Sequence, residues 1–340
     1  MMNSRAMNKN IPIFVTHYGC PNQCVFCNQK KISGVSRAMD YATCEKILKE
    51  ASLMGYDKEL TEIAFFGGSF TGIPRSEQKR YLEIANRYRD SFGGIRLSTR
   101  PDYINEEILE FLKAYGVTTI ELGVQSMVDE VLLKNRRGMT AEITKKAVKL
   151  IRQYDFSLGL QMMVSMYASS PMDDLYTADE ILLLKPDFVR IYPTVVLEDT
   201  ELYHLYQRGE YSLKSLDDTI ELVTDIYEKF QKHHIPVIRI GLMAGEEINS
   251  QKVIGAYHES FGELVQGELF YRRICAQLVG QEIIGKELKI CCHPRKVSCI
   301  IGHQKKNAIR LKERFFLKNI KVIPKGREHE DENFILLEWN

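Results

Sequence analysis

Along the first three quarters of the chain, short apolar runs alternate with longer stretches in which apolar residues recur every three or four positions. The runs are typical of buried strands and the spaced stretches of amphipathic helices. Six strands are predicted in this way, within 11–17, 61–68, 94–100, 117–126, 157–165 and 187–193. Helices are predicted between them, within 44–54, 76–90, 105–116, 140–153 and 173–184. This alternation predicts parallel βα units, with the chemistry at the carboxyl ends of the strands.

Beyond these units the pattern changes. A longer helix is predicted over 216–232 and a short strand over 235–242, and from 286 onward the order is strand, helix, helix, strand. We therefore predict a disordered N-terminus over 1–10, a main α/β unit over 11–245, a helical connector over 246–285 and a small α+β module over 286–340. Within the main unit, Asn105 is the expected N-cap of one helix, and Gly116 follows its end.

The composition is that of an ordinary globular protein, since 44% of its 340 residues are hydrophobic and 27% are charged. No apolar run approaches the length needed to span a bilayer, and the first ten residues lack the apolar core of a secretory leader. A cytoplasmic protein without a membrane partner is expected. In that compartment its eight cysteines indicate metal or redox chemistry rather than disulfides.

The net charge of +1 is unevenly distributed. Between Lys286 and Arg327 there are thirteen Lys and Arg residues against two acidic ones, whereas the last thirteen residues are acidic. This asymmetry predicts a basic module attached to a nearly neutral main unit.

Three of the cysteines, Cys20, Cys24 and Cys27, lie in one loop after the first strand, "HYGCPNQCVFCNQKKISG". A structural zinc site needs four ligands, and a cubane iron–sulfur cluster is usually held by four cysteines. His17 is nearby but belongs to the incoming strand. A C-x-x-C pair alone also fits a zinc knuckle or a redox pair, whereas a cluster on three cysteines leaves one iron open for a substrate or cofactor.

The spacing C-x-x-x-C-x-aromatic-C resembles the signature of the radical S-adenosylmethionine (SAM) enzymes, with Phe26 as the aromatic residue. The resemblance implies a partial parallel (β/α)6 barrel. It also implies a 4Fe-4S cluster on Cys20, Cys24 and Cys27, whose remaining iron binds SAM. Reduction by a one-electron donor such as flavodoxin or ferredoxin would cleave SAM to methionine and a 5′-deoxyadenosyl radical.

Further motifs extend the resemblance over about residues 11 to 245. "FFGGSFTG" places two glycines after the second strand, and "LSTRPDYI" and "ELGVQS" resemble the radical domain of the Elongator catalytic subunit. The G-V-Q is also similar to oxygen-independent coproporphyrinogen oxidase. The resemblance implies cofactor contacts by Phe26, Gly67, Gly68, Ser69, Thr99, Arg100, Gln125, Ser126 and Gln161.

The chain departs from these families at several positions. Ser98 stands at a glutamate position, Ser165, Met166 and Tyr167 replace a G-L-P, and Asp199 stands where glycine is usual. An acetyltransferase segment like that of the Elongator subunit is not evident, so acetyl transfer is not implied.

In the terminal module, "IIGHQKKNAIRL" is similar to the G-x-x-G loop of KH-type RNA-binding domains. Lys305 replaces the second glycine. RNA contacts are expected from Gly302, Lys305, Lys306 and Arg310, whereas the alternative is a solvated basic face.

The remaining cysteines and nearby histidines raise the alternative of a second metal site. They are Cys275, Cys291, Cys292, Cys299, His293 and His303. Adjacent residues on a strand point to opposite faces, which argues against Cys291 and Cys292 sharing one ion. Buried core thiols are the expected interpretation for this set and for Cys44.

The leading hypothesis is a radical SAM enzyme that modifies RNA, with tRNA as the expected substrate. One alternative is a radical SAM oxidase of a small molecule, similar to the coproporphyrinogen enzyme. The other is a non-enzymatic RNA-binding protein with structural zinc. No residue that handles the substrate radical is assigned from the sequence.

Overall fold

The computed structural model describes residues 9–15, 20, 24–27, 39–242, 253–325 and 333–339. By its internal contacts the chain divides into two units, Met1–Ser215 with Lys229–Tyr257 and Leu216–Glu228 with His258–Asn340. The expected disorder at the N-terminus falls largely outside the described residues, and the boundaries at 245 and 285 stay predictions. In the described ranges, no helix combines the length and the apolar character that crossing a membrane requires.

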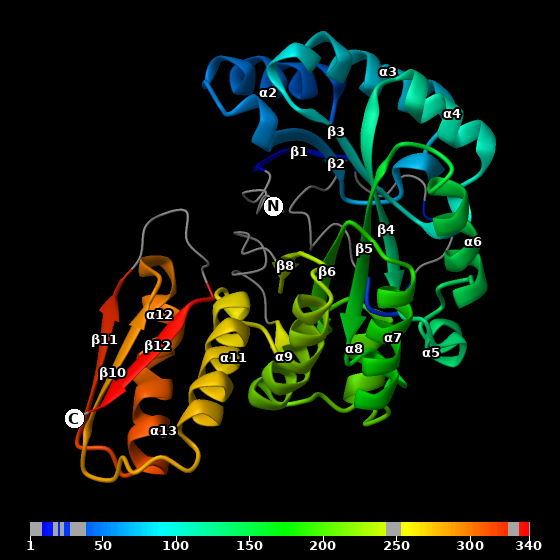
Figure 1. The fold of residues 1–340 in the computed structure, drawn as a ribbon. Coiled ribbons are helices and arrows are strands. Elements are labelled where there is room, and N and C mark those ends of the chain that lie inside the picture. Colours follow the sequence, from blue (N-terminus) through cyan, green and yellow to red (C-terminus); the bar gives the residue numbers. More distant parts are fainter. Residues whose placement is uncertain are drawn as a thin grey trace. The chain divides into compact units, whose positions relative to one another are not determined.

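The first unit is built on a curled, seven-stranded sheet in which all strands are parallel and follow the order of the chain (Figure 1). The strands are β1 (Lys9–Phe14), β2 (Thr61–Phe66), β3 (Gly94–Thr99), β4 (Val117–Gln125), β5 (Ser157–Val164), β6 (Phe188–Pro193) and β8 (Val237–Ile240). The predicted partial barrel is confirmed, and the short strand predicted over 235–242 joins the same sheet as its seventh member.

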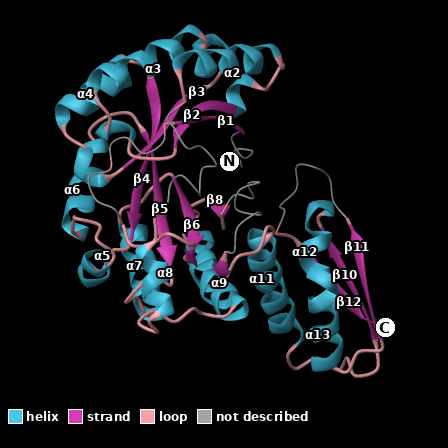
Figure 2. Ribbon diagram, turned by 180° about the vertical axis from the view of Figure 1, so that it is seen from behind, coloured by secondary structure: helices cyan, strands magenta, loops and turns pink. Residues whose placement is uncertain are grey.

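Helices connect successive strands and lie along the outside of the curled sheet (Figure 2). They are α2 (Tyr41–Leu53), α3 (Arg75–Arg87), α4 (Glu106–Ala114), α5 (Asp129–Lys134), α6 (Ala141–Ile151), α7 (Pro171–Leu183) and α8 (Glu201–Gln207). Most of α9 (Leu216–Lys232) belongs to the second unit. The short helices α5 and α8 were not predicted, nor was the small antiparallel pair β7 (Val195–Val196) and β9 (Ile254–Gly255).

Helix α4 shows how local sequence sets these elements. The Asn105 side chain accepts a hydrogen bond from the Ile108 amide at 2.8 Å and so caps the N-terminus, as predicted. Gly116 follows the helix with a φ of 73°, which a residue with a side chain rarely adopts. Ile108, Leu109 and Leu112 are buried, so the capped helix presents one apolar face to the core.

The second unit contains a three-stranded sheet with the order β11-β10-β12 and the helices that cover it. Its elements are α11 (Phe261–Leu278), β10 (Glu287–Cys292), α12 (Val297–Ile301), α13 (Lys306–Arg314), β11 (Asn319–Pro324) and β12 (Ile335–Trp339). The predicted order of strand, helix, helix, strand is found from 286 onward. The antiparallel strand β12 was not predicted.

The cysteines of the second unit lie in its apolar core. Cys275, Cys292 and Cys299 pack with Phe270, Leu288 and Ile300 among others. Burial raises the pKa of the Cys292 thiol to about 11, which keeps it protonated at neutral pH. Since the structure describes no group of three His, Cys, Asp or Glu side chains arranged to hold a metal ion, it offers no second metal site in the described ranges.

Candidate active site

The three cysteines of the N-terminal loop follow β1, at the carboxyl end of the sheet. Cys24 is buried, Cys20 and Cys27 are half-buried, and none of the described cysteines forms a disulfide. The Cys27 amide donates to the Cys24 carbonyl at 3.0 Å, which closes a tight turn. His17 lies outside the described residues. As described, the three thiols do not form a ready metal-binding group, so their role as cluster ligands stays a prediction.

The turn between Cys24 and Cys27 is fixed by its neighbours in the first unit. The Val25 amide donates to the Asn135 carbonyl at 3.3 Å, and the Val25 carbonyl accepts from the Leu202 amide at 2.8 Å. Val25 is buried in an apolar cluster with Leu202, and Phe26 packs against that cluster. The predicted aromatic position thus helps to hold the cysteine loop on the fold.

Two buried guanidinium groups lie beside the thiols. Arg137 donates to the Cys24 sulfur at 3.4 Å and to the Gly123 carbonyl at 2.6 Å. Arg100 donates to the Arg137 carbonyl and, through Nε, to Asp102 at 2.8 Å. Because Arg137 follows β4 by twelve residues and belongs to no predicted element, the sequence did not single it out.

The same guanidinium groups influence the pKa of the Cys20 thiol. Burial raises the pKa of this thiol, and the nearby Arg100 guanidinium partly opposes that effect. Within the described part of the chain, Arg100 Nη1 is buried and has no hydrogen-bond partner. A buried donor of this kind is costly unless a bound group satisfies it, so it marks space for an acceptor.

The carboxyl ends of β2 and β3 meet in a cluster of hydroxyl groups. Ser69 Oγ lies 2.8 Å from Thr99 Oγ1, which lies 2.6 Å from Thr71 Oγ1. The Arg100 amide donates to Ser69 Oγ at 3.3 Å. The structure therefore brings together three residues that the sequence assigned to the cofactor, Ser69, Thr99 and Arg100. Thr71 completes the cluster and was missed.

The paired glycines lie between β2 and this cluster. Both are half-buried, and Gly67 has a φ of 95°, a conformation that favours glycine. Without side chains, the backbone at Gly67 and Gly68 allows a ligand to approach closely.

At the end of β4, Gln125 adopts a left-handed backbone with a φ of 69°. Its Oε1 is buried and finds no hydrogen-bond partner among the described residues. Gly123 leaves room for the side-chain amide of Gln125, because a Cβ at position 123 would lie only 3.0 Å from Gln125 Nε2. Ser126 has a structural partner instead: its Oγ lies 3.3 Å from Thr177 Oγ1.

On β5, Gln161 is half-buried and donates through Nε2 to Glu121 at 2.7 Å. Glu121 belongs to a buried network of charged side chains that the sequence did not reveal. Its other charged members are Glu62, Arg96 and Arg190. The only sequence signal was a single charged residue within each of four otherwise largely apolar strands.

The departures from the family patterns have local explanations. Ser165 has a φ of 58°, and its amide donates to the buried Asp174 carboxylate at 2.8 Å. Asp199 has a φ of 62°, a conformation that glycine adopts freely and aspartate tolerates better than most residues. The chain therefore keeps a left-handed backbone where the family has glycine.

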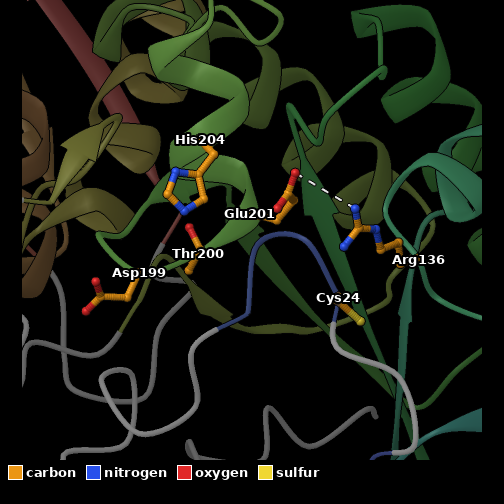
Figure 3. Close-up of a pocket in the computed structure, with 6 residues that line it drawn as sticks. All are labelled: Cys24, Arg136, Asp199, Thr200, Glu201 and His204. Carbon is orange, nitrogen blue, oxygen red and sulfur yellow. Dashed lines mark ion pairs between the residues drawn. The ribbon is translucent and has the colours of Figure 1, made fainter.

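A polar pocket of about 360 Å³ opens beside Cys24 (Figure 3). Its walls are formed by Cys24, Arg136, Asp199, Thr200, Glu201 and His204. Arg136 and Glu201 point toward each other across the pocket, with 3.8 Å between Nη2 and Oε1. Thr200 caps α8 by accepting from the Tyr203 amide at 3.1 Å, which fixes this wall.

In the second unit, the segment from Gly302 to Lys305 connects α12 and α13. Gly302 and Lys305 have φ values of 79° and 64°, and the side chain of Lys305 is exposed. Lys306 donates to Asp217 at 2.7 Å. Arg310 pairs with Glu268 and lies 3.7 Å from the centre of the Tyr271 ring. Of the four expected RNA contacts, Lys305 is thus the side chain that extends from the loop itself, and all four stay predictions.

Comparison with protein families gives two matches. A model described as the radical SAM superfamily matches residues 14–170, and one described as the radical SAM C-terminal domain matches residues 186–270. Together they span well over half of the chain. Members of this superfamily use a 4Fe-4S cluster and SAM.

Two curated relatives illustrate the sequence similarity. The chain is 37% identical over 206 residues to the tRNA uridine(34) acetyltransferase of Methanocaldococcus jannaschii, covering 54% of this chain and 38% of that protein. It is 26% identical over 201 residues to Elongator complex protein 3 of Bos taurus, covering 53% of this chain and 37% of that protein. The chain thus matches less than half of the length of either relative.

Among solved structures, the archaeal Elp3 of Methanocaldococcus infernus superposes with a TM-score of 0.59 at 23% identity. The match covers 80% of this chain and 64% of that one. At this identity the likeness establishes the fold alone.

Proposed function

The chain belongs to the radical SAM superfamily, and we propose that Cys20, Cys24 and Cys27 hold a 4Fe-4S cluster at which it binds and reductively cleaves SAM to modify tRNA. One observation carries the proposal. Three thiols of one loop lie beside two buried guanidinium groups, and the guanidinium of Arg137 donates directly to the Cys24 sulfur.

The chemistry of the donor set, rather than the described arrangement of the thiols, supports such a group. Three thiolates without a fourth protein thiol in the loop are the donor set of a cluster with one open iron. Arg137 and Arg100 supply positive charge where thiolates would concentrate negative charge. The unpartnered Arg100 Nη1 and Gln125 Oε1 offer one donor and one acceptor to a polar ligand.

The chain's own residues would position the cofactor. The backbone at Gly67 and Gly68 admits the methionine end of SAM, and the hydroxyl cluster around Thr99 supports the neighbouring strand end. Gln125 and Gln161 offer polar contacts to the nucleoside. When bound, the cluster and SAM together supply one-electron cleavage of a carbon–sulfur bond and hydrogen abstraction from the substrate.

The tRNA part of the proposal is supported by two observations. Both curated relatives carry names linked to tRNA modification or Elongator, although the chain matches only part of each. The second unit presents a basic loop with Lys305 exposed at its end. The cationic loop is expected to contact nucleic acid phosphates.

The decisive experiment is anaerobic reconstitution with iron and sulfide, followed by reduction with SAM in the presence and absence of total tRNA. We expect 5′-deoxyadenosine to form and tRNA to increase its rate and gain a modified nucleoside. Cys24→Ala should abolish cluster assembly and 5′-deoxyadenosine, whereas Cys44→Ala, at a buried thiol of helix α2, should retain both.

Other outcomes would favour the alternatives. Zinc without iron or labile sulfide would favour the non-enzymatic RNA-binding protein. Cleavage of SAM that is indifferent to tRNA would favour a small-molecule substrate.

A further inference from the structure

Four charged side chains are buried on the inner face of the curled sheet of the first unit. Phe65 of β2 packs against Tyr81 of helix α3, so its side chain lies on the outer face of the sheet. Side chains alternate between the two faces along a strand, and Glu62 is three positions from Phe65, so the Glu62 side chain lies on the inner face. The four side chains and their exposed fractions are Glu62 (6%), Arg96 (3%), Glu121 (0%) and Arg190 (8%). They come from β2, β3, β4 and β6, so the network links the neighbouring strands β2, β3 and β4 and reaches past β5 to β6.

Their contacts form one neutral network. Glu62 accepts from Arg96 Nε at 2.8 Å. Glu121 Oε1 accepts from Arg96 Nη1 at 2.6 Å and from Arg190 Nη2 at 3.0 Å. Two carboxylates and two guanidinium groups cancel in charge, which makes their burial tolerable.

One member of this network reaches the candidate active site. Glu121 Oε2 lies 2.7 Å from Gln161 Nε2, and the same nitrogen lies 3.4 Å from Ser98 Oγ. An ionised carboxylate only accepts hydrogen bonds, so the atom of Gln161 that meets it must be the amide nitrogen. The Gln161 carbonyl oxygen is therefore the atom left for a ligand.

We propose that Glu121 is a positioning residue that fixes the side-chain amide of Gln161 with its carbonyl oxygen presented to the cofactor. Gln161 then selects a hydrogen-bond donor, which in SAM is a ribose hydroxyl or the adenine amino group. The inference rests on the proposed function, since it takes SAM as the ligand. It specifies that the carbonyl oxygen of Gln161 contacts SAM, and it adds Glu121 as a residue that affects SAM binding only through Gln161.

The test replaces the amide with an acid. In Gln161→Glu, two carboxyl groups face each other and share one proton, and their mutual repulsion raises the pKa of the pair. The charged groups joined to position 161 are Glu121 directly and Arg96 and Arg190 through it. With the proton present, the introduced carboxyl group donates to Glu121 and still presents an acceptor; without it, repulsion turns the introduced side chain away.

The SAM dissociation constants of reconstituted Gln161→Glu and wild type are measured by anaerobic equilibrium dialysis, and we expect their ratio, variant over wild type, to rise about tenfold or more from pH 6 to pH 8.5. The ratio is the relevant quantity because the α-amino group of SAM itself titrates in this range and affects both proteins equally, whereas the Gln161 amide does not titrate. A Gln161→Glu profile parallel to the wild type would overturn the inference. A wild type that binds no SAM would instead overturn the proposed function.

A thermodynamic cycle separates positioning from general stability. Glu121→Gln lets position 121 donate to position 161, which reverses the Gln161 amide, so we expect SAM affinity to fall about tenfold. In a Gln161→Ala background the same substitution should leave the affinity unchanged. Glu62→Gln disturbs the network without touching Gln161, so it should lower the melting temperature but not the affinity. If Glu121→Gln costs the same with and without Gln161, Glu121 is structural and the inference fails.

Discussion

Two consecutive arginines of the first unit have opposite surroundings. Arg137 is buried and donates to the Cys24 sulfur, whereas Arg136 is exposed and pairs with Glu201 across the pocket. A donor to a ligating sulfur and its positive charge both stabilise the more negative, reduced form of an iron–sulfur cluster. Substitutions at Arg137 and Arg136 therefore provide a test and a matched control for the effect of a nearby positive charge on the potential of the proposed cluster.

We expect Arg137→Gln to lower the midpoint potential of the reconstituted cluster, because the positive charge beside Cys24 is lost. An anaerobic redox titration followed by electron paramagnetic resonance measures the potential. Arg136→Gln should change it less, since the exposed Arg136 guanidinium is screened by solvent and paired with Glu201. Equal shifts in both variants would contradict a specific role for Arg137.

Asp174 gives the fold a pH dependence at a single residue. It accepts from Ser165 at 2.8 Å and from Ser169 at 2.6 Å, yet burial raises the pKa of this carboxyl to about 6. The native state therefore binds the Asp174 proton more tightly than the unfolded chain does. Protonated Asp174 stabilises the fold at low pH, and this contribution to the free energy of unfolding is lost as the pH rises from about 4 through 6.

Asp174→Asn removes this titration. We expect the unfolding free energy of the wild type, relative to the variant, to fall by about 2 kcal/mol between pH 4 and pH 7. Thermal unfolding at a series of pH values measures it. Asp173→Asn, at the neighbouring carboxylate of the α7 capping box, should keep most of the wild-type pH dependence, because burial raises the pKa of Asp174 more than the charge of Asp173 does. A difference between wild type and Asp174→Asn that does not vary with pH would refute the role of Asp174.

Among the elements, helix α4 depends on its first polar contact. The Asn105 side chain satisfies the Ile108 amide, which has no partner within the helix. We expect Asn105→Ala to lower the free energy of unfolding by about 1 kcal/mol and Asn105→Ser to lower it by a few tenths at most. Denaturant unfolding measures both, and equal losses would show that the cap is not the cause.

The elements themselves were largely predictable because their signal is local. Short apolar runs indicated all seven strands of the main sheet, and apolar residues recurring every three or four positions indicated its longer helices. The buried charge network was not predictable in this way. Strand register brings Glu121 to Arg96 and Arg190, which are 25 and 69 residues away in the chain. Strand β12 was missed because its five residues follow an acidic stretch and pair with β10 from a distance.

The candidate site shows the same division. The cysteines, the paired glycines and Gln125 lie at or beyond strand ends, and Gln161 lies within β5; all were found from spacing and resemblance. Arg137 and Thr71 act through contacts with residues that are far away in sequence, 113 and 28 positions respectively. Thr71 lies within "FFGGSFTG", but the resemblance assigned no role to Thr71 or to Arg137, so only the fold reveals these contacts.

For the molecule as a whole, the two units divide the proposed work between cofactor chemistry and tRNA binding. We expect Lys305→Glu to weaken tRNA binding and to reduce the slope of log affinity against log salt by about 1, because one phosphate contact is lost. Filter binding at several salt concentrations measures this slope. Cleavage of SAM without tRNA should be unaffected.

Lys149→Glu is the matched control, since it reverses an exposed charge on helix α6 of the first unit. An equal loss of tRNA affinity in both variants would indicate that overall charge, rather than the loop between α12 and α13, governs binding.

The in-order parallel sheet also bears on biosynthesis. Each strand pairs with the one made before it, so the sheet can grow from β1 onward while the ribosome is still translating. Cys24 emerges early, but Arg137 follows 113 residues later, which at ordinary elongation rates is a delay of roughly ten seconds. During that interval the nascent Cys24 thiol lacks the guanidinium neighbour that it has in the folded chain.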